Sequence, residues 1–403
     1  MTNVVWLFID SLRKDIFDST ETLMKKEIFE KGINLTNCFS QGGWTYPSFG
    51  SFITGKYPTS NGMTILDLKS KNKEKTKWPW SDSRLPRLKG KTIFDILSKK
   101  NFKLLTICHP ILGEDYDYEG WNRIKENELS IADILDWIGK NKDNNFFLFI
   151  RTDITHASKW PGFKESKYEE VTDLVKKGIK DDVKKFKKLM ISCLKKIDDG
   201  FFSPLFKKLN EIGLVKDTIF IINADHGDTL GEALLRTNNI HKGDYQVLHT
   251  TCFDEVIKVP CAIRYDKKIQ KRNIALMTRL IDILPTILCL IELEKEYTGD
   301  GKNLLKEEDL NSITYSYGES SNSVYLRNYS EKLIFYPKEK KVLLFDLKED
   351  PLENKPLNDI NLQKKMFGIL DKEVFKGKFK IDSLKLIDEE IIKNRLRNLG
   401  YTD

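Results

Sequence analysis

Residues 42–58 read GGWTYPSFGSFITGKYP and predict a glycine-rich approach followed by the start of a helix. Pro47 suits a first helical turn, where its missing N–H costs no hydrogen bond, and Thr45 is the expected N-terminal cap. The N–H groups at a helix start carry partial positive charge, which favours a bound phosphate, sulfate or oxyanion. A threonine can also be an ordinary cap, so its function depends on the other motifs of the chain.

Two apolar runs predict buried parallel strands that end in side chains able to bind a metal. Residues 4–9 lead into Asp10, and residues 218–223 lead to the pair Asp225-His226. Open α/β sheets bind ligands at the carboxyl ends of their strands, and oxygen with imidazole suits a hard or borderline divalent ion. An aspartate after a strand is also a common helix cap, so neither motif decides the function alone.

Strands and helices are expected to alternate along most of the chain. We predict a helix over 92–99, strands over 103–108 and 145–150, a helical region over 168–209 with a turn near Asp198, and a buried helix within 280–293. This pattern predicts an α/β fold in which helices flank a large mixed, mostly parallel sheet. The catalytic domain is expected to span residues 1–309.

The end of the chain is predicted to form a small α+β subdomain, residues 310–403. Its expected elements are short antiparallel strands at 312–317, 332–336 and 341–346 and a closing helix at 387–399.

Composition excludes several classes of protein. The chain has 403 residues, 40% of them hydrophobic, and a net charge of +7, which is typical of a globular protein. Lysine runs are read as solvated faces, so no nucleic-acid partner is expected. Apolar segments are too short or too interrupted for a membrane span. Six scattered cysteines indicate free thiols in a reducing compartment, so we expect a cytoplasmic protein.

The segment Thr45-Tyr46-Pro47-Ser48, followed by Thr-Gly-Lys-Tyr-Pro at 54–58, resembles the nucleophile segment of the sulfatase family within the alkaline phosphatase superfamily. In that family a Cys or Ser stands in the place of Thr45 and is oxidised to formylglycine, and an Arg stands in the place of Phe49. Oxidation of a threonine would give a ketone, so formylglycine is not expected. The resemblance implies direct attack by the Thr45 hydroxyl, as in phosphodiesterase and phosphonate hydrolase relatives.

Other segments carry the same resemblance along almost the whole chain. Asp10-Ser11-Leu12-Arg13 is similar to the first metal-binding segment of the family, with Ser11 replacing a second Asp, and Asp225-His226-Gly227 is similar to a later one. Residues 280–286, 300–305 and 344–354 resemble further landmarks.

The resemblance also implies two substrate-binding histidines. His156 follows the strand at 145–150, where the family has a histidine that contacts the substrate or its leaving group. Counting back from Val259-Pro260 places His249 on a Lys or His of the family, with His241 and Lys242 as competitors for that role.

The implied function is hydrolysis of a phosphate, phosphonate or sulfate ester, carried by a small anionic molecule or an anionic glycan. Asp10, Thr45, Asp225 and His226 would hold one divalent cation, expected to be Mg, Mn or Ca, with Zn as a further candidate. The activated Thr45 hydroxyl would attack in line, and His156 and His249 would bind ester oxygens or protonate the leaving group.

Three rival functions are also compatible with the sequence. Asp153, His156 and His249 can supply a second ion, which would make the protein a two-metal phosphodiesterase. A formylglycine-dependent sulfatase is the second rival, and Thr45 argues against it. The third is a non-catalytic protein that keeps the sulfatase fold for binding.

Overall fold

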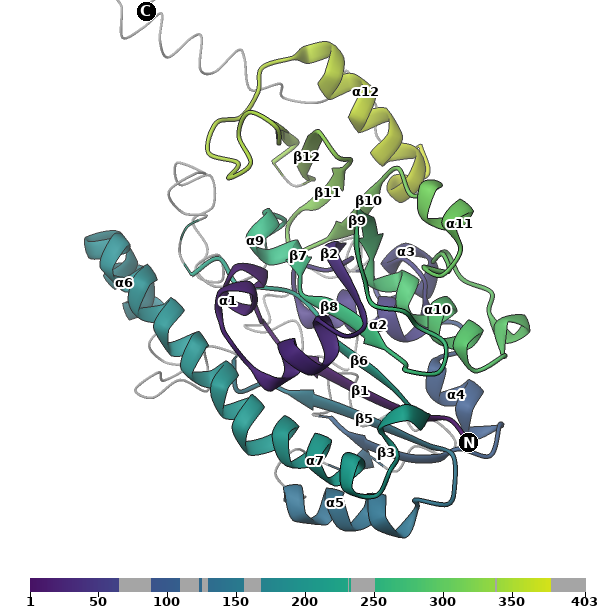
Figure 1. The fold of residues 1–403 in the computed structure, drawn as a ribbon. Coiled ribbons are helices and arrows are strands. Elements are labelled where there is room, and N and C mark those ends of the chain that lie inside the picture. Colours follow the sequence, from purple (N-terminus) through teal and green to yellow (C-terminus); the bar gives the residue numbers. More distant parts are fainter. Residues whose placement is uncertain are drawn as a thin grey trace, which may run out of the picture.

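The computed structural model describes residues 1–64, 88–108, 123–124, 130–155, 168–230, 232, 251–337 and 339–377. The α/β fold is the one predicted (Figure 1). Within the described residues, no helix combines the length and the apolar composition needed to cross a bilayer.

A mixed sheet of nine strands forms the centre of the described structure, in the order β4-β3-β5-β1-β6-β8-β2-β7 with β9 beside β2. The strands are β1 (Asn3–Ile9), β2 (Ile33–Phe39), β3 (Lys103–Ile107), β4 (Arg123–Ile124), β5 (Phe146–Thr152), β6 (Thr218–Ala224), β7 (Lys258–Val259), β8 (Cys261–Arg264) and β9 (Arg272–Arg279). From β4 to β6 all neighbours are parallel. β8 joins β6 in antiparallel fashion, as β2 joins β8 and β7 joins β2.

β1 lies between β5 and β6, and every residue of β1 and β6 is buried. Such strands need apolar side chains on both faces, which explains their continuous Val, Ile and Phe content. The register sets Phe8 opposite Arg151 and Ile9 opposite Ala224, so the carboxyl ends of the three strands meet at one edge of the sheet.

Helices cover both faces of this sheet. They are α1 (Lys14–Ser19), η1 (Lys25–Phe29), α2 (Thr45–Thr54), α3 (Pro58–Asn61), α4 (Ile93–Ser98), α5 (Ile131–Lys140), α6 (Tyr168–Ile197), η6 (Asp198–Phe202), α7 (Ser203–Glu211), η7 (Val215–Asp217), α9 (Asp254–Ile257), η8 (Leu280–Asp282), α10 (Ile283–Leu290), η9 (Glu294–Glu296) and α11 (Glu307–Asn311). In Figure 1, α5, α6 and α7 lie on one side, and α2, α3 and α10 lie on the other. Capping boxes begin α4 at Thr92 and α5 at Ser130.

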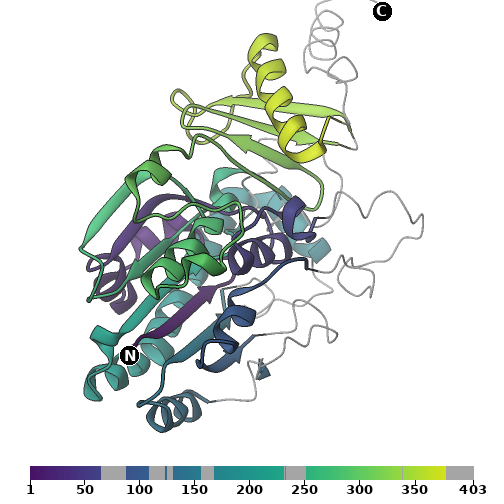
Figure 2. The same cartoon turned by 90° about the vertical axis from the view of Figure 1, so that its right-hand side faces the viewer.

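A second sheet follows, an antiparallel meander of β10 (Ser316–Glu319), β11 (Val324–Arg327), β12 (Glu331–Tyr336) and β13 (Lys341–Asp346). Helix α12 (Ile360–Leu370) and η10 (Asp371–Phe375) pack on it and form a separate layer in Figure 2. Their shared core contains Leu326, Phe335 and Phe367.

This sheet also supports the loop before α2. Gly42 forms a bridge with Glu319, and the N–H of Gly43 donates to the Glu319 carbonyl at 3.0 Å. A side chain on Gly43 would clash with the carbonyl oxygen of Thr251, which explains the glycine.

Several local predictions were wrong. Trp44, not Thr45, is the N-cap of α2, because Trp44 has an extended backbone and Thr45 is the first helical residue. The Thr45 hydroxyl contacts Asp10 and His226 and does not cap the helix. No turn separates helices at Asp198, because its carboxylate accepts the N–H groups of Leu23 and Met24 and the chain continues as η6.

In the second sheet, the first strand begins at Ser316 and not at 312, because Ser312 still closes α11. The four-residue strand β11 was not predicted. The predicted helix at 387–399 lies outside the described residues.

Candidate active site

Four side chains that the sequence analysis singled out lie together at the carboxyl edge of the main sheet. Asp10 follows β1, Asp225 and His226 follow β6, and Thr45 begins α2. β1 and β6 are adjacent and parallel, so the turns that leave them are neighbours although the residues are far apart in sequence.

Asp10, Asp225 and His226 form a buried cluster able to hold a cation. One ligand atom from each lies within 4.8 Å of the others. The Nε2 atom of His226 is 3.6 Å from Asp10 Oδ1 and 3.6 Å from Asp225 Oδ2. These separations are those of atoms that share a small ion.

The hydrogen bonding of the cluster fits a divalent cation. Nδ1 of His226 lies 2.7 Å from the Gly227 carbonyl oxygen, so it carries the proton and leaves the Nε2 lone pair facing the carboxylates. Asp225 Oδ2 is buried and accepts no hydrogen bond from the described residues. Burial raises the pKa of Asp225 to about 6, and the neighbouring Asp10 carboxylate adds to the rise. A cation would compensate this buried negative charge.

Thr45 is the most exposed member of the group. Its Oγ1 lies 3.4 Å from Asp10 Oδ2 and 3.3 Å from His226 Nε2. Thr45 is half-buried, whereas the three cluster residues are at most 1% exposed. Among these four residues, Thr45 is therefore the one that solvent reaches most easily.

Ser11 orients both aspartates. Its φ of 60° is in the left-handed region, an uncommon conformation for a serine. In this conformation its N–H donates to Asp225 Oδ1 at 3.1 Å, and its hydroxyl donates to Asp10 Oδ1 at 2.8 Å. Ser48 of α2 and Thr155 add hydrogen bonds to the backbone carbonyls of Asp225 and Asp10.

Arg151 is a site residue that sequence reasoning missed. It lies near the end of β5, is 8% exposed, and its Nη2 forms an ion pair with Asp10 Oδ2. Its guanidinium lies 5.9 Å from the centroid of the Phe8 ring. The signal in the sequence was a charged residue directly after the apolar run Phe146–Ile150.

Phe49, in the place of the family's arginine, points into the protein core. It is fully buried among Phe8, Phe52 and Phe149, with ring centroids 5.9, 5.4 and 6.0 Å away. No positive charge enters the site from this position of α2.

The turn that carries His226 rests on α9. The N–H of Gly227 donates to the Val256 carbonyl at 2.6 Å. On the same helix, Asp254 pairs with the buried Lys332 of β12 at 2.9 Å, and its N–H donates to Glu353 at 2.6 Å. The second sheet therefore supports the cluster through α9.

The two predicted substrate histidines, His156 and His249, lie outside the described residues, as do His241 and Lys242. Asp153 is described, and it is not part of the candidate metal cluster found in the described part of the chain.

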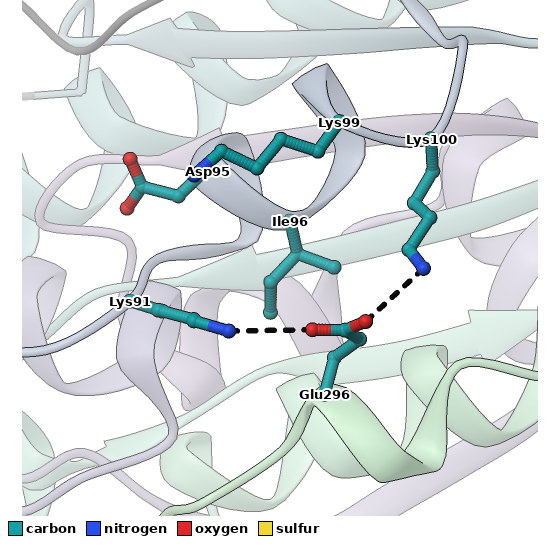
Figure 3. A pocket seen from close by; sticks show the side chains of 6 residues that line it. All are labelled: Lys91, Asp95, Ile96, Lys99, Lys100 and Glu296. Carbon is teal, nitrogen blue, oxygen red and sulfur yellow. Dashed lines mark hydrogen bonds and ion pairs between the residues drawn. The ribbon is translucent and has the colours of Figure 1, made fainter.

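A surface pocket of about 260 Å³ is lined by none of the clustered residues (Figure 3). Its walls come from α4, which leads into the start of β3, and from Glu296, which pairs with Lys91 at 3.3 Å and Lys100 at 3.0 Å. The pocket lies near the amino ends of the parallel strands, whereas Asp10 follows the carboxyl end of β1. The pocket is therefore not part of the candidate site.

Comparison with known proteins shows that residues 2–293 match the sulfatase family. The chain belongs to the sulfatase family. All four clustered residues fall inside the matched range, so Thr45, Ser11 and Phe49 stand inside the sulfatase portion of the chain.

Two curated proteins resemble parts of this sulfatase-family chain. An endo-4-O-sulfatase of Bacteroides thetaiotaomicron is 29% identical over 191 residues, which is 40% of this chain and 36% of that protein. The low-salt glycan biosynthesis sulfotransferase Agl7 of Haloferax volcanii is 24% identical over 248 residues, 57% of this chain and 47% of that protein. The chain thus covers less than half the length of either relative.

Solved structures share the fold over nearly the whole chain. A 2-O GAG sulfatase has a TM-score of 0.68 at 16% identity, covering 98% of this chain and 96% of its own. A protein of glycosaminoglycan metabolism in Bacteroides thetaiotaomicron has a TM-score of 0.67 at 17% identity. The match covers 98% of this chain and 99% of that protein. These likenesses confirm the predicted sulfatase-type fold.

Proposed function

We propose that this sulfatase-family chain is a metal-dependent ester hydrolase in which Thr45 is the nucleophile. The observation that supports it most is the position of the Thr45 hydroxyl, which begins a helix and lies within 3.4 Å of the buried Asp10 and His226. A nucleophile needs a neighbouring group that activates it and a positive environment for the anionic ester. The helix start and the cation site provide both.

The chemistry follows from the neighbours of Thr45. Oγ1 forms a bond to the sulfur or phosphorus of the ester as the bond to the alcohol oxygen breaks in line, and its proton passes to Asp10 Oδ2, 3.4 Å away, or to solvent. A divalent cation held by Asp10, Asp225 and His226 would supply positive charge for a non-bridging oxygen. The alcohol leaves after taking up a proton, for which His156 and His249 are the proposed donors.

Water then attacks the ester on Thr45, which restores the hydroxyl and releases the acid, namely sulfate, phosphate or its monoester, or a phosphonic acid, according to the ester class. The proposed substrate is a small anionic ester or a sulfated glycan, because the similar proteins include a 2-O GAG sulfatase and a sulfotransferase of glycan biosynthesis. Phosphate and phosphonate esters stay in the proposal because Thr45 replaces the residue that yields formylglycine.

A second candidate is transfer of the acid group to an acceptor hydroxyl instead of water. The name of Agl7, a sulfotransferase, favours testing it. The two activities share the ester on Thr45 and differ only in the molecule that releases it.

The decisive experiment is an assay of chromogenic sulfate and phosphate monoesters, phosphodiesters and phosphonate esters with Mg²⁺, Mn²⁺, Ca²⁺ or Zn²⁺. We expect turnover of one ester class, loss of it in Thr45→Ala, and its retention in Thr54→Ala. Thr54 is the matched control because it is a buried threonine of the same helix whose hydroxyl donates to helix carbonyls. Full activity in Thr45→Ala would reject the proposal.

The number of metal ions bound per chain distinguishes the proposed hydrolase from a two-metal phosphodiesterase and from a binding protein. One ion per chain supports the proposed site, and two ions would favour the two-metal phosphodiesterase. Absence of both metal and hydrolysis across the panel would favour a non-catalytic binding protein.

A further inference from the structure

Arg151 and Thr45 meet at one oxygen atom. The Nη2 atom of Arg151 forms an ion pair with Asp10 Oδ2, and Thr45 Oγ1 lies 3.4 Å from that same oxygen. The other oxygen, Oδ1, accepts the Ser11 hydroxyl and lies 3.6 Å from His226 Nε2. The two oxygens of Asp10 therefore have different neighbours: Oδ1 faces the cation ligands, and Oδ2 faces the guanidinium and the nucleophile.

We propose that Arg151 is a positioning residue that limits Asp10 to one oxygen for the cation and thereby weakens the hold of the cluster on a divalent ion. This inference rests on the proposed metal site. A guanidinium stays charged at every physiological pH, and it repels a cation bound to the same carboxylate. The repulsion is strong because both groups are withdrawn from solvent, Arg151 at 8% exposure and Asp10 at zero.

The partner of Arg151 belongs to the candidate metal cluster. Arg151 reaches Asp10, which lies 141 positions away and directly follows the neighbouring strand β1. The other buried arginines of the described structure that form ion pairs, Arg13, Arg264, Arg279 and Arg327, pair with acidic residues outside this cluster. It adds a positive charge to a cluster of two carboxylates, where the place of the family's arginine is taken by the buried Phe49.

The position of the guanidinium is fixed by the sheet. Arg151 lies opposite Phe8 in the β1–β5 register, and the Phe8 ring lies 5.9 Å from its guanidinium carbon. A contact held by two central strands does not move aside when a cation binds. Arg151 therefore lowers metal affinity permanently and keeps Oδ2 next to Thr45.

The test is calorimetric titration of the full chain with MnCl₂ alone. We expect Arg151→Gln to bind Mn²⁺ at least about tenfold more tightly than the wild type, because a charge is lost and Oδ2 becomes available to the ion. Arg151→Lys keeps the charge and should stay within about threefold of the wild type. Arg264→Gln, a buried arginine paired with Glu27 and Asp266 away from the cluster, should bind as the wild type does.

The outcomes distinguish failure of the role proposed for Arg151 from failure of the proposed metal-dependent function. If Arg151 only stabilised the structure, its replacement would loosen the site and would not tighten metal binding. Equal or weaker Mn²⁺ binding by Arg151→Gln, compared with the wild type, therefore overturns the inference. If that variant does not fold, an Arg151→Lys affinity that differs from the wild type by tenfold in either direction overturns it as well. Asp225→Asn tests the metal site itself: if it binds Mn²⁺ as tightly as the wild type, the proposed function fails and not only the role of Arg151.

Discussion

The hydroxyl oxygen of Thr45 lies 3.3 Å from Nε2 of His226, although 181 positions separate the two residues in the sequence. Thr45 reaches this point because α2 starts at the edge where β6 ends. Ser48, one turn further along α2, strengthens the junction by donating its hydroxyl to the Asp225 carbonyl at 2.7 Å. The proposed nucleophile and the proposed cation ligands are therefore held together where the start of α2 packs against the end of β6.

Removal of metal should destabilise the wild type and leave Asp225→Asn nearly unchanged. A ligand at about 100 times its Kd stabilises the folded state by about 2.7 kcal/mol, which a chelator removes. Asp225 supplies a buried oxygen that accepts no hydrogen bond within the described structure, so its amide variant should lose metal binding first. Thermal unfolding with and without EDTA measures this. A melting temperature of the wild type that EDTA does not move would contradict the prediction.

Restoring the family's arginine at position 49 should unfold the protein and not improve catalysis. Phe49 is surrounded by the rings of Phe8, Phe52 and Phe149, and a charge placed there would cost more than about 4 kcal/mol. Phe49→Leu, the apolar control, should cost about 1–2 kcal/mol and keep the metal site. Urea unfolding of both variants gives the comparison. A stable and active Phe49→Arg variant would show that position 49 does not lie in the aromatic core described above.

Gly227→Ala should damage the cation site through α9. A Cβ at position 227 would clash with the backbone carbonyl of Glu255, which cannot rotate away. The turn that carries His226 would have to shift, so we expect at least about tenfold weaker metal binding. Gly368→Ala is the matched control in α12: its Cβ would meet no atom within 4 Å, and helix propensity should add about 0.5–1 kcal/mol of stability. Mn²⁺ titration and thermal unfolding of the two variants test this, and equal metal affinities would refute it.

The stability of the protein should decline as pH rises toward 7 because of Glu353. Burial raises the pKa of Glu353 from 4.5 to about 7, while Lys332 opposes the rise and Asp254 adds to it. The folded state then binds the proton more tightly than the unfolded state. The stabilisation is complete below pH 4.5 and is lost as pH passes 7, by about 3 kcal/mol.

Glu353→Gln should remove that part of the pH dependence. Urea unfolding at pH 5 and pH 8 measures it, and the difference between the two pH values should shrink in Glu353→Gln and stay unchanged in Glu349→Gln, an exposed control. If Glu353→Gln and Glu349→Gln showed the same difference in unfolding free energy between pH 5 and pH 8, the pH dependence would belong to other groups.

The residues that the sequence indicated were those with a strong local signal. Asp10 and Asp225 follow apolar runs long enough to be recognised as buried strands, and Thr45 comes just before a proline that marks the first helical turn. Parallel strands end at a common edge, so their meeting point could be expected without coordinates.

Arg151 and Ser11 could not be assigned in the same way. Whether Arg151 faces Asp10 depends on β5 being the neighbour of β1 and on their register, which no local pattern encodes. The role of Ser11 depends on a left-handed φ, which sequence favours in glycine and asparagine and not in serine. The second sheet was predicted as a unit, but its contacts with the active-site turns follow from tertiary packing.

The family match ends at residue 293, yet residues after 293 contact the segments that carry Thr45 and His226. Glu319 holds the approach to Thr45, and Lys332 with Glu353 holds the helix beneath His226. A fragment trimmed to residues 2–293 would keep the four clustered residues and lose the contacts that support the turns carrying them. Substitutions in the second sheet, β10–β13, that disturb these contacts should therefore lower the activity of the protein, even where the altered side chain lies far from the substrate.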